Sequence, residues 1–162
     1  MFETMLPLFD FALGYCRRLA ADIREDEMSL QPVAGVHTPV WILGHLATTL
    51  DYGLKPLGQP MLCSKRWHVQ FGPGSSDTAK LEAPPTKEEL LQAIAAGHAA
   101  LLAASITADP VAMNQPHGLA VLANSPIQTV GDLIAHLMTT HFATHLGQLS
   151  VWRRVTGRPP LF

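Results

Sequence analysis

The sequence predicts an all-α fold, a four-helix bundle in which the whole chain, residues 1–162, forms a single domain. Apolar residues recur at three- and four-residue steps in four segments, and helix-start signals precede three of them. Connections rich in proline and glycine separate the four segments, and no stretch alternates apolar and polar residues long enough for a convincing strand. A chain of 162 residues is long enough to bury a core of its own.

The first two helices are expected in the N-terminal third of the chain. The first runs from about Glu3 to Ile23, although Pro7 is tolerated only within its first turn. The second begins at Thr38-Pro39, a hydroxyl cap followed by proline at the first helical position, and fades between Gly53 and Gly58.

A long irregular connection is expected from Gly58 to Pro85, with Gly72-Pro73-Gly74-Ser75-Ser76 at its middle. A connection of this length inside a small domain is usually functional or a crossover between helices.

The last two helices open with caps of the same kind. A capping box at Thr86–Glu89 starts the third helix, which continues to about Ala108. The fourth opens at Thr129–Asp132 and runs to about Thr156, where glycine and prolines follow.

Composition excludes several classes of function. Hydrophobic residues make up 48% of the chain and charged residues 15%, which is unlike a disordered protein. The net charge of −2 offers no basic field for nucleic acid. Cys16 and Cys63 form no disulfide framework and no signal-peptide pattern is present, so a cytoplasmic location is expected. The apolar stretch Leu90–Ala108 follows a soluble-helix cap, so we expect a buried bundle helix and no membrane partner.

The unusual feature of the composition is its eight histidines, which are the candidate functional residues. His141 and His145 lie about 40° apart around a helix axis and about 6 Å apart along it, so both imidazoles can reach one ion. Hydrogen-bonded core histidines without metal are the alternative for this spacing. His45 on the second helix is the expected third ligand, and three histidines would leave coordination positions open. Phe142 occupies the position where zinc proteases of the His-Glu-x-x-His type need glutamate.

Other polar and aromatic residues are expected to line a pocket or to support the ligands: Trp41, Thr49, Tyr52, His98 and Gln148. A core hydrogen bond is the alternative role for His98. In a regular helix His136 lies about 140° from His141, which favours a helix contact or solvent over coordination. The remaining histidines are expected on loop surfaces, at His37, His68 and His117.

Three segments together resemble one known family. They are TPVWILGHLA at Thr38–Ala47, HFATHLGQL at His141–Leu149, and the tail WRRVTG at Trp152–Gly157. The chain resembles the DinB/YfiT-like superfamily of metal-binding four-helix bundles. The resemblance implies up-down-down-up helix order, with the long connection as the crossover between helices two and three.

The same resemblance implies one divalent metal ion, nickel or zinc first and iron next, held by His45, His141 and His145. It also implies an activity on a small molecule, such as a transferase that uses a low-molecular-weight thiol. Many relatives have an acidic residue where Phe142 stands here, so a general base is missing at that position. A non-catalytic bundle that binds metal or a small ligand, and a metal-free scaffold that forms a homodimer, are the alternatives.

Overall fold

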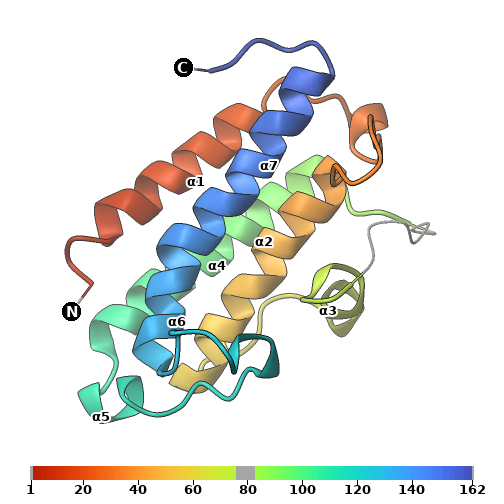
Figure 1. Ribbon diagram of the computed structural model, residues 1–162. Helices are drawn as coiled ribbons and strands as arrows, with labels where there is room; N and C mark the ends of the chain where they lie inside the picture. Colours follow the sequence, from red (N-terminus) through yellow and green to blue (C-terminus); the bar gives the residue numbers. More distant parts are fainter. Residues whose placement is uncertain (1, 76–82, 162) are drawn as a thin grey trace.

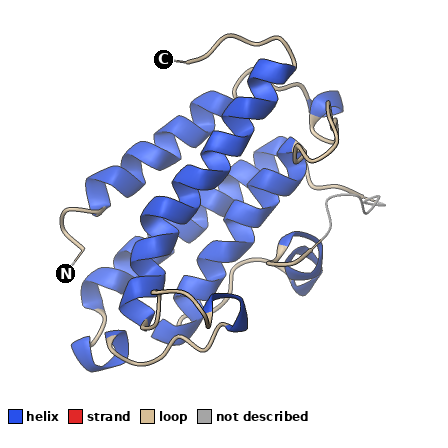
Figure 2. Ribbon diagram, viewed as in Figure 1, coloured by secondary structure: helices blue, strands red, loops and turns tan. Residues whose placement is uncertain are grey.

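The computed structural model describes residues 2–75 and 83–161, and across these residues it is helical, with no strand (Figures 1 and 2). Four long helical stretches lie side by side: α1 (Leu6–Ala20), α2 (Pro39–Leu54), α4 (Lys87–Thr107) and the continuous run α6 (Val130–His136), η4 (Leu137–His141) and α7 (Phe142–Val155). α2 packs against α4 and α7, and α1 packs against the same two helices. The expected all-α fold is confirmed and is consistent with a four-helix bundle, whereas the helix order stays a prediction.

The predicted helix starts at Thr38, Thr86 and Thr129 are confirmed. Each threonine hydroxyl accepts a hydrogen bond from a backbone N–H three residues later, and these caps satisfy donors that the helix itself leaves unpaired. α1 is shorter than expected, since it begins at Leu6 and ends at Ala20. Pro7 restricts the helix start because proline has no backbone N–H.

The connection from Gly58 to Pro85 is not wholly irregular. It contains α3 (Lys65–Phe71), which Ser64 caps by accepting a hydrogen bond of 3.2 Å from Trp67 N–H. A helix of seven residues is too short to show clear apolar periodicity, which is why the sequence pattern missed it. The part of the expected glycine- and serine-rich middle that includes Ser76 lies outside the described residues.

Phe71 packs the end of α3 against α2 at a point where α2 has a glycine. A Cβ atom added to Gly44 would lie 2.4 Å from the Phe71 ring, and Phe71 is 1% exposed. The absent side chain of Gly44 therefore makes room for α3 to lie directly on α2.

The fourth helix is not regular, contrary to expectation. Five residues between α6 and α7 form a π-helical turn, η4, in which hydrogen bonds span one residue more than in an α-helix. Four short segments complete the described chain: η1 (Glu25–Glu27), η2 (Lys55–Leu57), α5 (Pro110–Met113) and η3 (Ala120–Leu122).

α4 is long and apolar enough, by length and composition alone, to cross a membrane. The core helix of a soluble protein passes the same test. Here α4 packs against α1 and α2, and it buries Leu90, Ile94 and Leu101 completely.

Replacing Gly44 with alanine is expected to destabilise the protein by about 1–3 kcal/mol, because the added methyl group overlaps the buried Phe71 ring. Gly14→Ala is the matched control, since nothing lies within 4 Å of its Cβ position and alanine favours the helix. Urea unfolding of both variants measures the difference, and equal stability of the two would contradict the packing described.

Candidate metal centre

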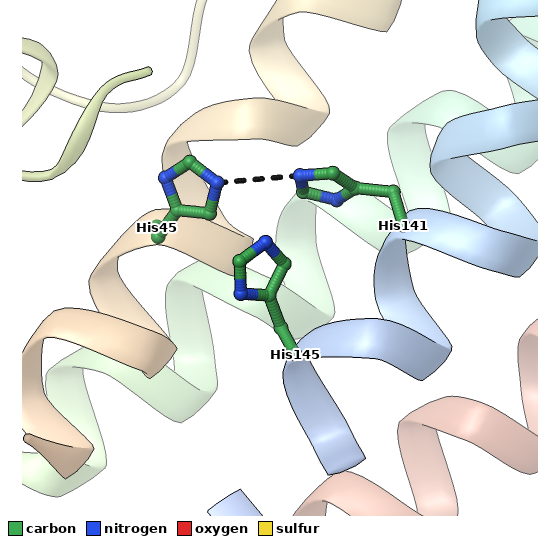
Figure 3. A group of neighbouring side chains, drawn as sticks. All are labelled: His45, His141 and His145. Atoms are coloured by element: carbon green, nitrogen blue, oxygen red, sulfur yellow. Dashed lines mark hydrogen bonds between the residues drawn. The ribbon is translucent and has the colours of Figure 1, made fainter. Parts of the chain in front are cut away.

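Three histidines from two separate helical stretches meet in the bundle. His45 comes from the middle of α2, His141 ends η4 and His145 lies one turn into α7 (Figure 3). Each offers a ring nitrogen, and these three atoms all lie within 4.8 Å of one another. The Nε2 atoms of His45 and His141 are 3.2 Å apart. The structure therefore brings together the three residues expected to hold a metal ion.

Burial keeps the cluster uncharged. His45 is 6% exposed and His145 is 9% exposed. Desolvation, reinforced by the neighbouring His145, lowers the pKa of His45 to about 4 and that of His141 to about 2. The pKa of His145 is also lowered, again by desolvation. Near neutral pH the rings are therefore neutral imidazoles, the form that coordinates metal.

Hydrogen bonds select the ring nitrogen that His45 and His145 direct into the cluster. Nδ1–H of His45 donates to the backbone carbonyl of Phe71 over 2.6 Å, and Nδ1–H of His145 donates to Oε1 of Gln148 over 2.8 Å. A carbonyl oxygen can only accept, so the proton of each ring sits on Nδ1 and Nε2 keeps its lone pair. Histidine ligands of metals almost always donate their other N–H in this way.

The separation between the nitrogens of His45 and His141 fits a first-row divalent ion. Two imidazole nitrogens, each about 2.0–2.1 Å from a tetrahedral zinc ion, are about 3.3 Å apart. The measured separation between His45 and His141 is 3.2 Å. Nickel and Fe(II) also accept imidazole ligands, so the donor set suits a small group of metals.

A stack of rings supports His45 from the side. Trp41 lies parallel to His45 with ring centroids 4.6 Å apart, and His37 covers the other face of Trp41 at 4.0 Å. The indole N–H of Trp41 donates to the Ser75 hydroxyl over 3.0 Å. His37 is thus half-buried against Trp41, not a surface loop residue as expected. The stack fixes the ring plane of His45.

Thr49 and Tyr52 lie beside the cluster, as the sequence suggested. The Thr49 hydroxyl donates to the backbone carbonyl of His45 over 2.7 Å. Both residues line a cavity of about 270 Å³, and His45 and His141 form part of its wall. The histidine cluster is therefore accessible from this cavity.

A family model described as the DinB superfamily matches residues 8–149. The chain belongs to the DinB superfamily. A crystal structure described as the conserved protein of locus from Enterococcus faecalis is similar in fold, with a TM-score of 0.70, 17% sequence identity and 96% of each chain covered. No curated protein matches the sequence.

Phe142 faces the core in this DinB-superfamily chain. It is fully buried and meets Phe9 of α1 edge to face, with ring centroids 5.7 Å apart. The side chain at this position therefore points toward α1 and lies in the apolar interior.

His98 is a residue of α4 whose side chain lies against α1. Its ring stacks on Phe9 at 4.0 Å, and its Nε2 is 3.2 Å from the Asp10 carboxylate, without the geometry of a hydrogen bond. Among the described residues Nε2 has no hydrogen-bond partner, whereas the ring makes a hydrogen bond with the backbone of Phe9, as expected of a core histidine. His98 does not line the cavity beside the cluster.

His136 approaches His141 more closely than a regular α-helix allows, although it is not part of the three-histidine group. Their ring centroids are 5.4 Å apart, and both residues line the same cavity. The separation of about 140° assumed a regular α-helix. In the π-helical turn residue i+5 lies above residue i, so five residues return to the same face. No sequence signal identified this turn.

Asp51 anchors the connection between α2 and α4 to α2, and the sequence reasoning missed it. Its carboxylate is fully buried and accepts hydrogen bonds from Leu62 N–H, Cys63 N–H and His68 Nε2–H, at 2.9, 2.9 and 2.8 Å. His68 therefore lies on α3 with its side chain 12% exposed, not on a loop surface. Burial, and then Asp51, raise the pKa of the Cys63 thiol to about 12, so it is no reactive thiolate.

His117 is likewise tied into the structure. Its Nε2–H donates to the carbonyl of Ile127 over 2.9 Å, and its Nδ1 accepts from Leu119 N–H over 2.9 Å. The half-buried ring closes the loop before α6, instead of lying free on a surface as expected.

Acidification is expected to destabilise the metal-free protein. The pKa of His45 is lowered to about 4 and that of His141 to about 2, so below the ordinary value of about 6.5 the unfolded chain binds protons that the folded chain does not. The contribution of these two residues to the free energy of unfolding is fully present above about pH 6.5. As the pH falls from there toward the pKa of each residue in the folded state, each residue lowers the free energy of unfolding by up to about 1.4 kcal/mol per pH unit. Urea unfolding between about pH 7 and 5 measures the slope. An equal slope in His141→Gln would contradict this origin.

Removing the Asp51 carboxylate is expected to cost about 2–4 kcal/mol of unfolding free energy, because Asp51→Ala leaves three donors without their acceptor. Asp26→Ala serves as the comparison, since Asp26 forms an exposed ion pair with Arg24 and its removal should change little. Denaturant unfolding of both variants measures the effect. An Asp51→Ala protein as stable as Asp26→Ala would show that other contacts hold the connection between α2 and α4 against α2.

Proposed function

We propose that this DinB-superfamily protein is a divalent-metal-dependent enzyme that acts on a small molecule, with His45, His141 and His145 holding one ion. The observation that carries the proposal is the convergence of three neutral imidazoles, two of which have their Nδ1 protons committed to carbonyl oxygens. Nickel or zinc is the favoured metal, with iron next, because imidazole donors suit all three.

The chain's own residues prepare the site in three ways. Phe71 and Gln148 set the tautomers of His45 and His145, and the Trp41 stack fixes the plane of His45. Burial keeps the rings unprotonated. When bound, a divalent ion lowers the pKa of a coordinated water or thiol and so supplies a nucleophile near neutral pH.

A transferase that uses a low-molecular-weight thiol is the leading activity, and metal-dependent hydrolysis is the second. Three protein ligands leave coordination positions for a thiol or water, and the adjoining cavity gives room for a small substrate. The wider proposal includes up-down-down-up helix order, a cytoplasmic homodimer, and no nucleic-acid or membrane partner.

A non-catalytic bundle that binds metal or a small ligand is the alternative. One observation favours it: among the described residues that line the cavity, none is acidic. A carboxylate general base is therefore not seen beside the cluster within residues 2–75 and 83–161. Turnover of thiol-adduct substrates by the metal-loaded protein would favour the enzyme, and full turnover by the metal-free protein would exclude a metal-dependent one.

Untagged protein is expected to contain about one divalent ion per chain, and His45→Ala and His141→Ala are expected to lose it, because two imidazoles hold an ion much more weakly than three. Elemental analysis after dialysis measures the content. A chelator should lower the melting temperature of the wild type, since an ion bound only to the folded state stabilises it.

His98→Gln is the matched control for these variants. His98 is a buried histidine on α4 that contacts Phe9 and Asp10. This variant is expected to keep the full metal content, with folding of every variant checked by circular dichroism. Metal retained by both His45→Ala and His141→Ala would overturn the proposed site.

A further inference from the structure

The cavity beside the cluster reaches only two of the three histidines. His45 and His141 form part of its wall, whereas His145 does not. Figure 3 shows the rings of His45 and His141 facing each other, with His145 approaching from α7. A molecule in this cavity therefore meets the cluster on the side of His45 and His141.

Most of the remaining wall is apolar. Pro73 and Gly74 form one edge of it, and five residues from the loop before α6 and from the α6–η4 stretch form the rest: Leu119, Val121, Leu122, Leu133 and Leu137. The polar contributions come from Thr49, Tyr52 and His136, and the Thr49 hydroxyl already donates to the backbone. No described residue of the lining is Asp, Glu, Lys or Arg.

An ionised group that enters such a cavity loses its hydration. It recovers that free energy only when an opposite charge or several hydrogen bonds replace the water, and the apolar wall provides neither. The volume of about 270 Å³ lies just below the usual range for drug-sized ligands, which is about 300–1,000 Å³. As far as residues 2–75 and 83–161 form it, the cavity therefore suits a compact molecule whose body carries no charge.

We propose that this cavity selects a compact, uncharged molecule with an apolar body and one donor atom directed toward His45 and His141, and that it discriminates against small thiols bearing a carboxylate or an ammonium group. This inference rests on the proposed metal function for the role of the donor atom. It adds the class of ligand, which the histidine cluster alone does not specify.

The test compares matched thiols on the cobalt-loaded protein. Binding of 1-butanethiol, 3-mercaptopropionate and cysteamine is measured by the thiolate-to-cobalt absorption band. Butanethiol is expected to bind at least about tenfold more tightly than either charged thiol. The ion's positive charge by itself would favour the carboxylate, so a preference for butanethiol over 3-mercaptopropionate can come only from the cavity wall. Equal or tighter binding of 3-mercaptopropionate would overturn the inference.

A charge placed at the rim should change the selectivity. Val121 lines the cavity and is 68% exposed, so Val121→Arg can be made without disturbing the core. It is expected to tighten binding of 3-mercaptopropionate relative to butanethiol by about threefold or more. Val111→Arg is the matched control, because Val111 is 66% exposed on α5 and does not line the cavity. The same shift in both variants would contradict the assignment of the site.

A metal-free arm separates this inference from the proposed function. In the chelated protein, 2-phenylethanol is expected to shift the backbone amide signals of Leu119–Leu122, and 3-phenylpropionate at equal concentration is expected to shift them less. Failure to load cobalt would contradict the metal function, while this arm would still decide the selectivity of the cavity. Equal shifts with both compounds would overturn the inference.

Discussion

Three imidazoles share one desolvated space, and each must remain uncharged to stay there. This constraint governs the surrounding structure. A protonated ring at His45 or His141 would place a charge in the bundle interior with no carboxylate beside it in the described part of the chain, and their lowered pKa values express that cost. A neutral ring still has one N–H that needs an acceptor. Phe71 and Gln148 supply those acceptors for His45 and His145 from two different parts of the chain.

The acceptor for His45 depends on the connection between α2 and α4, which contains α3. The acceptor is the backbone carbonyl of Phe71, the last residue of α3. Two features hold α3 on α2: Gly44 leaves room for the Phe71 ring, and the buried Asp51 carboxylate binds His68 and the backbone before α3. A fully buried carboxylate is tolerated here since three hydrogen bonds compensate for its lost hydration. One side of the histidine cluster is thus built by a segment that is remote from it in sequence.

The other side depends on the π-helical turn. η4 adds a residue to one helical turn, which brings His136 and His141 to one face and leaves His145 on the regular helix that follows. The cavity wall contains residues from both sides of this turn, Leu133 and His141 among them. π-helical turns occur frequently at functional sites, and this one adjoins the histidine cluster.

The sequence by itself determined the helical class, the starts of α2, α4 and α6, and the three histidines that converge. The helix starts and the pairing of His141 with His145 follow from local chemistry, since a threonine caps the N–H three residues ahead of it and a four-residue spacing repeats on any helix. The meeting of His45 with that pair depends on how two separate helices pack. Only the tertiary structure decided that His98 lies against α1, that His68 binds Asp51 and that His136 turns toward His141. The burial that keeps the rings neutral comes from several helices, and the acceptor for His45 comes from α3, whereas the acceptor for His145 lies three residues further along its own helix. No local spacing encodes the contacts between separate helices.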